Sequence, residues 1–285
     1  MTTAPASILR SGFADFRDFI NPLIYNRAEL AREPIRFVRI DDGVLVDEDG
    51  QRVEDFHGTQ AFGHRNPAIA AAVREFLDSD LPNWFPSRVN PFAGKLARAL
   101  CERSRHYSNV YFACSGADAV EAALKLARSA TRRPRVLGLS GAYHGCTFGA
   151  VSLMHKGPFT EPFTPLLPGA ERLPFNDVAA LERELSVGDV AAVLVEPVQG
   201  EGGVRELPED YVAALCQLTA KHDVLLIADE VQTGMGRSGS FLYSARWPRR
   251  PDAALLAKQL GGGLVPIHRG GRSGDDGDDD HAAAR

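Results

Sequence analysis

The sequence predicts an α/β protein built on a mostly parallel β-sheet with helices on both faces. Short apolar runs typical of buried strands, such as residues 190–195 and 224–228, alternate with longer segments whose apolar residues recur every three or four positions. Strands and helices that alternate in this way form parallel sheets, because each helix carries the chain back along one face of the sheet. Several apolar runs end in polar or glycine-rich segments, which is where such sheets bind ligands.

The composition is that of an ordinary globular protein. The chain has 285 residues, of which 44% are hydrophobic and 24% are charged, and this fits one large domain or two smaller ones. A net charge of -5 argues against a general nucleic-acid binder, because neutralising phosphates needs a basic face. The four cysteines, Cys101, Cys114, Cys146 and Cys216, show no metal-ligand spacing, so we expect free thiols and no metal site.

The sequence also suggests where the protein resides. The N-terminus has one basic residue in its first ten and no apolar core run, which is unlike a signal peptide. No stretch is long and apolar enough to span a membrane. We therefore expect a cytoplasmic protein that binds neither membranes nor nucleic acid.

The first sixty residues differ from the rest in pattern. Residues 1 to about 35 predict an irregular or helical lead-in, in which Phe13, Phe16, Phe19 and Ile20 are spaced for one helix face. Residues 35–46 alternate around a turn at Asp41–Gly43, and a second turn at 47–50 precedes residues 52–56. This spacing predicts a small antiparallel meander.

Two helices and then repeated strand–helix units follow. Helices are expected over residues 68–78 and 91–103, each beginning near an Asn-Pro pair. The later elements are strands at 109–113, 135–139, 190–195, 224–228 and 253–257, and helices at 116–130, 178–185 and 209–222. Residues 268–285, HRGGRSGDDGDDDHAAAR, have no apolar periodicity and many aspartates and glycines, so we expect this tail to be disordered.

Two strand ends carry an acid and an amine that suggest a cofactor. The run Val224–Ala228 ends in Asp229, and the run Ala253–Ala257 ends in Lys258. If both strands lie in one parallel sheet, both side chains reach the crevice at its carboxyl edge. A carboxylate for a protonated ring nitrogen and an amine for an aldehyde carbon are what pyridoxal 5′-phosphate (PLP) needs. Taken singly, a capping aspartate and a solvated lysine are the plainer interpretations.

Three loops upstream offer the other contacts of such a cofactor. Ser115, Gly116 and Ala117 open a helix after a strand, and the N-terminus of a helix favours a phosphate; Ser115 could also be only a helix cap. Tyr143 and His144 lie between glycines, where an aromatic ring could stack on a planar ligand or simply line a turn. His144 has no visible acid partner, so we assign it no proton transfer.

Glu196 and Glu201 lie on a glycine-rich loop after the strand at 190–195. They could face the crevice, or the loop could be solvated. A second glycine-rich loop, Gly234–Gly239, matches the G-x-G-x-x-G dinucleotide pattern. No helical period follows it, so the strand–loop–helix context of that site is missing.

Five motifs in order resemble the class III (ω-amino acid type) aminotransferases. They are SGADAVEAALKLAR, GAYHG, VEPVQGEGG, IADEVQTGMGRSG and LAKQLGGG, and the resemblance covers about residues 35 to 267. It implies a fold type I, PLP-dependent enzyme that forms a homodimer. The chain would comprise an N-terminal segment of the small domain (1–60), an incomplete PLP-binding large domain (61–267) and the unrelated tail (268–285), so we expect a protein that is truncated relative to the family.

The resemblance also implies roles for individual residues. Lys258 would bond covalently to the cofactor, and Asp229 would pair with its ring nitrogen. The remaining cofactor contacts would be a phosphate site at Ser115, Gly116 and Ala117, ring contacts from Tyr143, His144 and Val231, and a hydrogen bond from Gln232 to the phenolic oxygen. Glu201 would gate substrate binding, and Glu196 lies on the same loop.

The implied reaction is a transamination. An amino group would pass from an amine or ω-amino acid, such as ornithine, acetylornithine, a diamine or γ-aminobutyrate, to a keto acid such as 2-oxoglutarate. Two alternatives stay open: another PLP chemistry on the same scaffold, such as an aminomutase, or a catalytically impaired fragment of such an enzyme.

Overall fold

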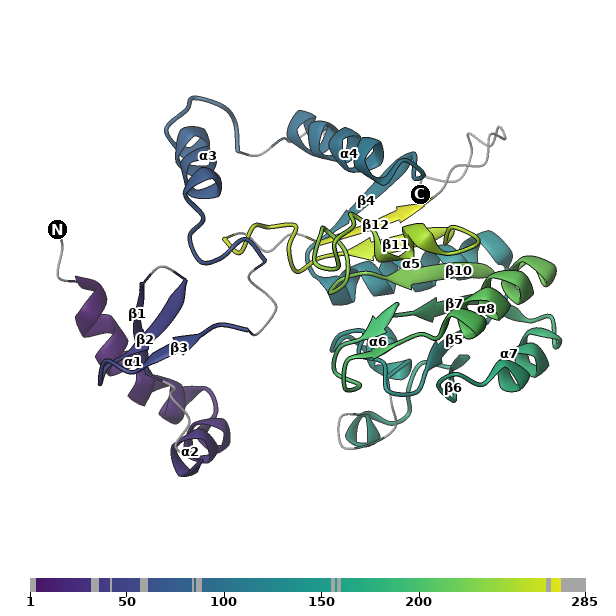
Figure 1. Ribbon diagram of the computed structural model, residues 1–285, viewed down its shortest axis with the longest axis horizontal. Coiled ribbons are helices and arrows are strands. Elements are labelled where there is room, and N and C mark those ends of the chain that lie inside the picture. Colours follow the sequence, from purple (N-terminus) through teal and green to yellow (C-terminus); the bar gives the residue numbers. More distant parts are fainter. Residues whose placement is uncertain are drawn as a thin grey trace. The chain divides into compact units, whose positions relative to one another are not determined.

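The computed structural model describes residues 4–31, 36–41, 43–56, 61–83, 85, 89–154, 157, 160–264 and 268–272. The chain forms two compact units, one up to Asn66 and one from Pro67 onward. The sequence placed this boundary after residue 60. Each unit has its own secondary structure, drawn in Figure 1.

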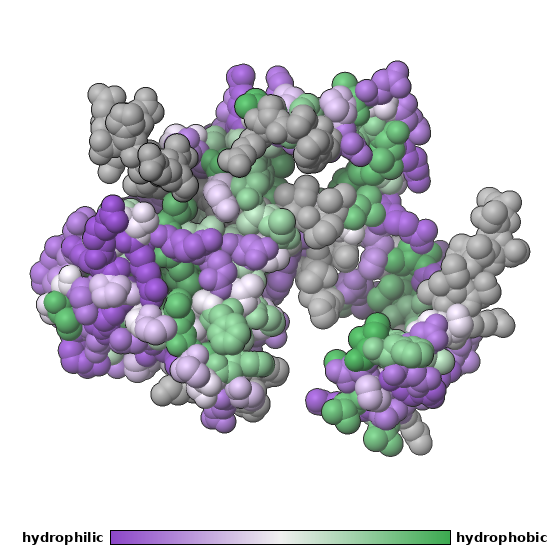
Figure 2. Space-filling view, turned by 180° about the vertical axis from the view of Figure 1, so that it is seen from behind, coloured by the Kyte–Doolittle hydropathy of each residue, from purple (hydrophilic) through white to green (hydrophobic). Residues whose placement is uncertain are grey.

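The first unit consists of two helices and a three-stranded meander. Its elements are α1 (Ala4–Phe19), α2 (Pro22–Leu30), β1 (Phe37–Asp41), β2 (Val44–Asp47) and β3 (Arg52–Glu54). The strands pair antiparallel in the order β1-β2-β3, as the alternating pattern predicts. Phe13 and Phe16 are half-buried on α1, whereas Phe19 and Ile20 are exposed. Green hydrophobic surface is accordingly visible on this unit in Figure 2.

The second unit is built on a seven-stranded sheet in the order β4-β12-β11-β10-β7-β5-β6. Its strands are β4 (Asn109–Ala113), β5 (Arg135–Leu139), β6 (Ala170–Leu173), β7 (Val190–Val195), β10 (Leu225–Asp229), β11 (Ala253–Leu256) and β12 (His268–Arg272). The neighbours from β11 to β6 pair in parallel, and only β12 runs antiparallel to its neighbours. The predicted α/β architecture with a mostly parallel sheet is confirmed.

Helices cover both faces of this sheet (Figure 1). The helices of the second unit are α3 (Pro67–Leu77), α4 (Pro91–Ser104), α5 (Gly116–Thr131), α6 (Phe148–Ser152), α7 (Val178–Leu185) and α8 (Glu209–Lys221). On one face, Ala123 and Leu124 of α5 pack with Leu194 and Ile227. On the other face, α7 and α8 pack with Val193 and Leu226. Successive residues of β7 thus point to opposite faces of the sheet. Because helices cover both faces, every residue of the strand is buried.

Several short elements have no counterpart in the predicted pattern. They are α6, β6, the 3₁₀ helices η1 (Glu161–Phe163) and η2 (Tyr243–Arg246), and a hairpin of β8 (Val198–Gln199) and β9 (Arg205–Glu206). Most span only a few residues, too few to show a period. The loop of this hairpin carries Glu201.

The prediction that the chain has no regular structure from residue 268 onward is wrong for His268–Arg272. These residues form β12, which lies between β4 and β11 and pairs with both. The composition predicts disorder because the segment has little apolar side chain to bury, but a strand needs only backbone groups to pair with its neighbours. The rest of the predicted tail, residues 273–285, lies outside the described residues.

No helix among the described residues is long and apolar enough to cross a membrane. All four cysteines carry free thiols, as their spacing predicts.

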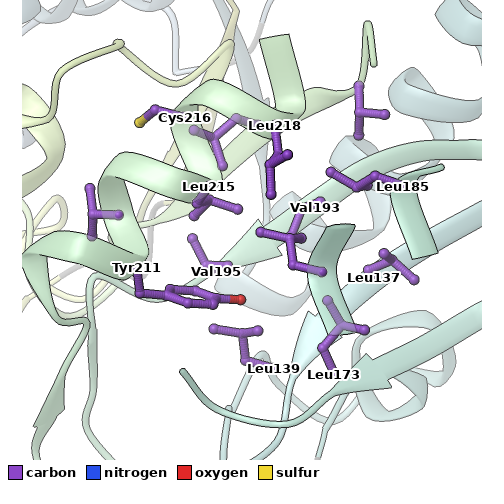
Figure 3. Packing of buried hydrophobic residues seen from close by; sticks show 14 of the residues in the cluster. Leu137, Leu139, Leu173, Leu185, Val193, Val195, Tyr211, Leu215, Cys216 and Leu218 are labelled. Carbon is purple, nitrogen blue, oxygen red and sulfur yellow. The ribbon is translucent and has the colours of Figure 1, made fainter. Parts of the chain in front are cut away.

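Tyr211 of α8 has a hydroxyl in an apolar environment. The residue is fully buried, and its oxygen has no hydrogen-bond partner among the described residues. Figure 3 shows the ring beside Leu139 and Val195 of the core. A buried polar group without a partner costs free energy.

Replacing Tyr211 by phenylalanine is therefore expected to raise the free energy of unfolding by about 1 kcal/mol. Urea unfolding followed by circular dichroism measures this change. Tyr107→Phe is the matched control, because the buried Tyr107 hydroxyl donates to the carbonyl of Pro251 at 3.0 Å and its loss should destabilise the fold. Destabilisation by both substitutions to the same extent would show that the Tyr211 hydroxyl is satisfied.

Candidate active site

Five strand ends converge on one cavity at the carboxyl edge of the large sheet. The chain leaves β4 toward α5, β5 toward Tyr143 and His144, β7 toward Glu196, β10 at Asp229, and β11 just before Lys258. Together with the β8–β9 loop and Val231–Gln232, these segments line a cavity of about 210 Å³. All the residues predicted for the site line this cavity except Ser115.

Asp229 is buried at this edge and is bonded to a histidine. Its Oδ2 lies 2.7 Å from Nδ1 of His144, whose side chain is fully buried, and its Oδ1 accepts from the backbone N–H of Val231 at 3.1 Å. The expectation that His144 lacks an acid partner is wrong. The two residues are 85 positions apart in the sequence, and only the sheet order β10-β7-β5 brings them together.

This pairing changes the protonation of His144. Burial lowers the pKa of the imidazole, but the hydrogen bond and the charge of Asp229 outweigh burial, so the pKa lies above its ordinary value. The ring therefore tends to hold its proton, and the hydrogen bond fixes the orientation of the Asp229 carboxylate.

Lys258 is half-buried and faces the same cavity. Its Nζ donates to Oε1 of Gln232 at 2.8 Å. The backbone carbonyl of Gln232 in turn accepts from Nε2 of Gln259 at 3.4 Å. The amine thus has a defined position close to the loop that follows Asp229.

The N-terminus of α5 forms another wall. The hydroxyl of Ser115 accepts from the backbone N–H of Asp118 at 3.0 Å and so caps the helix, which is the plainer of the two interpretations of this serine. Gly116 and Ala117 line the cavity at the positive end of the helix dipole. Gly145 has φ of 115°, and a Cβ there would lie 2.6 Å from that of Ala117, so only glycine lets this loop approach the helix so closely.

The loop after β5 holds Tyr143 beside the cavity. Its backbone N–H donates to Oε1 of Glu196 at 2.8 Å, and its hydroxyl lies 3.3 Å from Sγ of Cys146. The hydrogen bond to Cys146 and partial burial raise the pKa of Tyr143 to about 12. Burial raises the pKa of Glu196 to about 7, against the opposing charge of His144.

Glu201 connects this cavity to a larger one. The exposed Glu201 and Tyr143 line both the first cavity and a second of about 790 Å³. The guanidinium of Arg205 borders the second cavity, where it donates to Oε1 of Gln199 at 2.7 Å and lies 4.4 Å from the ring centroid of Phe175. A molecule that reaches Lys258 thus has an adjoining space next to it, with a carboxylate at the junction.

The sequence of the chain matches that of a known protein family. The family model for Aminotransferase class-III matches residues 25–273. The chain belongs to the class-III aminotransferase family.

Two curated aminotransferases and a solved structure are similar to the chain. It is 38% identical over 257 residues to acetylornithine aminotransferase from Methanopyrus kandleri, covering 89% of this chain and 65% of the relative. It is 38% identical over 272 residues to putrescine aminotransferase from Pectobacterium atrosepticum, covering 88% of this chain and 57% of the relative.

The solved structure is the ornithine aminotransferase from Toxoplasma gondii, whose active site holds PLP at partial occupancy. It superposes with a TM-score of 0.82 at 29% identity, covering 93% of this chain and 63% of the solved chain. The chain therefore spans less than two thirds of the length of these relatives.

PLP is the cofactor of this family, and the residues of the cavity fit it. A buried carboxylate, an amine and a helix N-terminus surround one space, and these groups match a protonated ring nitrogen, an aldehyde and a phosphate. A Cβ at Gly116 would lie 3.4 Å from Val231 and from Ala257, so the wall is packed to van der Waals contact there. The chain thus has the fold type I architecture and a cavity with the chemistry that its cofactor requires.

Glu230 is a residue that sequence reasoning passed over. It follows Asp229 directly, is fully buried, and burial raises the pKa of its carboxyl to about 7. One signal was available: neighbouring residues of a strand point in opposite directions, so an acid that follows the site residue must face away from the site. The hydrogen-bond donors around the Glu230 carboxylate, which the sequence does not reveal, explain why an acid is buried there.

Proposed function

We propose that this class-III aminotransferase chain transfers an amino group from an amine or ω-amino acid to a keto acid such as 2-oxoglutarate. One observation carries the proposal: the amine of Lys258, the carboxylate of Asp229 and the N-terminus of α5 line a single cavity. The substrates named for its relatives, acetylornithine, putrescine and ornithine, all carry a primary amine at a chain end.

When bound, PLP supplies an aldehyde carbon that takes up the amino group and a ring that accepts the electron pair released at the substrate carbon. Lys258 would be the residue that bonds to that carbon. Its amine, when free, would act as the general base for the proton that leaves the substrate carbon.

Asp229 would hold a proton on the ring nitrogen of the cofactor. Its charge is effective because the residue is buried, where water screens it little. His144 orients the carboxylate through the 2.7 Å bond to Oδ2 and leaves Oδ1 on the loop side. It also contributes to the wall of the cofactor cavity.

The remaining residues position the cofactor and the substrate. Val231 and Tyr143 would pack on the two faces of the ring, and Gln232 would donate to the phenolic oxygen. The backbone N–H groups of Gly116 and Ala117 would hold the phosphate, with Ser115 as cap of the same helix. Glu201 gates the passage between the two cavities, and Glu196 fixes the backbone at Tyr143.

We further propose that the enzyme acts as a homodimer, as is implied by the resemblance of its motifs to this family. Sizing chromatography coupled to light scattering tests this.

The test of the function is a two-substrate assay. Purified chain is mixed with PLP, 2-oxoglutarate and one donor at a time from ornithine, acetylornithine, putrescine and γ-aminobutyrate, and glutamate is quantified by mass spectrometry. We expect glutamate with at least one donor, and only when both PLP and the keto acid are present. A rearranged amine formed without any keto acid would mean aminomutase chemistry instead, and no product with any donor would contradict the proposal.

A further inference from the structure

The buried carboxylate of Glu230 is held by four donors from two segments. Its Oε1 accepts from the backbone N–H of Ser244 at 2.9 Å and from the Ser244 hydroxyl at 2.5 Å. Its Oε2 accepts from the backbone N–H of Tyr243 at 2.6 Å and from the hydroxyl of Thr233 at 3.4 Å. Both oxygens therefore face donors.

These donors lie at the two ends of one loop. Thr233 begins the glycine-rich segment after β10, and Tyr243 and Ser244 begin η2. The backbone of Glu230 adds to the attachment: its N–H donates to the carbonyl of Leu255 at 2.9 Å, and its carbonyl accepts from the N–H of Gly234 at 3.0 Å. Glu230 thus ties the start of the loop, its end and the adjacent strand β11 together.

The loop starts with two residues of the cofactor cavity. Val231 and Gln232 lie between Glu230 and Thr233, and both line the cavity. Gln232 also accepts the hydrogen bond from Lys258 at 2.8 Å. A displacement of the loop would therefore move the partner of the lysine amine.

We propose that Glu230 is a positioning residue of the cofactor site, which holds Val231 and Gln232 in place by fixing both ends of the loop from Val231 to Leu242. This inference rests on the proposed function, because it assumes that PLP occupies the cavity. Glu230 itself faces away from the cavity and touches no reacting atom.

Glu230→Gln is the informative substitution, because an amide has nearly the shape of a carboxylate but only one acceptor oxygen. Whichever way the amide turns, its NH₂ group meets a backbone N–H, either that of Ser244 or that of Tyr243. One backbone hydrogen bond of the attachment is therefore lost with almost no change in volume.

The chain offers a matched control in Glu206. This exposed carboxylate accepts from the hydroxyl of Tyr243 and from Arg246 at 2.8 Å, so it also binds η2, but from the solvent side. Glu206→Gln therefore disturbs the same short helix without touching the buried attachment.

The experiment is a PLP titration of wild type, Glu230→Gln and Glu206→Gln, followed by visible absorption. We expect the dissociation constant for PLP to rise about tenfold in Glu230→Gln and to change less than about twofold in Glu206→Gln. The pH at which the visible band of the bound cofactor titrates should also shift in Glu230→Gln alone, because Gln232 contacts the lysine amine.

Equal affinities and equal midpoints in Glu230→Gln and wild type would overturn the inference, as would equal losses in both variants. A wild type that takes up no PLP would instead refute the proposed function. If Glu230→Gln does not fold, Ser244→Ala, which removes one donor, should weaken PLP about threefold, and an unchanged affinity there would overturn the inference as well.

Discussion

Replacing Lys258 by alanine is expected to abolish covalent attachment of PLP to the chain. Lys258 follows β11 at the carboxyl edge of the sheet and is the lysine that lines the cavity of Asp229 and the α5 N-terminus. An amine outside the cavity gains nothing from these contacts and reacts with PLP only as any surface lysine does. Reduction with borohydride followed by peptide mapping measures the attachment, and the label on the peptide with residue 258 should vanish.

The control for this variant is Lys221→Ala. Lys221 lies on α8, is mostly exposed and forms a loose ion pair with Glu182 at 3.6 Å. Its loss should leave the labelled peptide unchanged. A single labelled peptide that persists in Lys258→Ala would show that another amine serves the cofactor.

Replacing Asp229 by asparagine is expected to slow the reaction of the bound cofactor with an amine by about 100-fold or more. The amide keeps the shape of the side chain but removes the charge that holds a proton on the ring nitrogen. Stopped-flow absorption after mixing the PLP-loaded chain with the best donor measures the rate. The control is Asp223→Asn, because the Asp223 side chain is fully exposed and lies 3.7 Å from Arg133 in a loose ion pair.

The same substitution should be visible at His144. Asp229 raises the pKa of this buried imidazole against the effect of burial, so in Asp229→Asn the pKa should fall below its ordinary value. A histidine whose pKa is higher in the folded than in the unfolded protein stabilises the fold. This contribution is complete at a pH below the unfolded pKa, and it is lost as the pH rises through the folded pKa. Wild type should therefore gain stability from His144 as the pH falls through the raised pKa of its imidazole toward the ordinary histidine pKa, and the variant should not.

NMR titration of the His144 ring and thermal unfolding over a pH series check both statements. An unchanged His144 pKa in Asp229→Asn, or a reaction rate within about threefold of wild type, would remove Asp229 from its proposed role.

Much of the fold follows from local sequence patterns. The strands at 109–113, 135–139 and 190–195 have the predicted bounds, and the meander and the helices at α5, α7 and α8 lie where periodicity places them. The helices and the strands of the large sheet are predictable because each is long enough to show a period or an apolar run, and the meander is predictable because turn residues separate its alternating segments. The carboxyl-edge rule then places Asp229 and Lys258 in one crevice before any coordinates are known.

The tertiary structure decided how these residues are paired. Asp229 ends β10, and its hydrogen-bond partner His144 follows β5, which lies two strands away in the sheet. No spacing in the sequence encodes that strand order. The hydroxyl of Ser115 accepts a hydrogen bond as the cap of α5. The carboxylate of Glu230 faces η2 and not the cavity. Such choices depend on which donors happen to surround a side chain once the elements have packed.

The strand β12 shows the same division most clearly. Side-chain composition by itself determined that residues 268–285 cannot contribute an apolar core, and it predicted disorder. Yet β4 and β11 each present a row of backbone donors and acceptors to the gap between them, and His268–Arg272 pair with both rows. The sequence determines which side chains a segment can bury, whereas backbone hydrogen bonding, which all residues but proline share, is satisfied only when the fold brings the partners together.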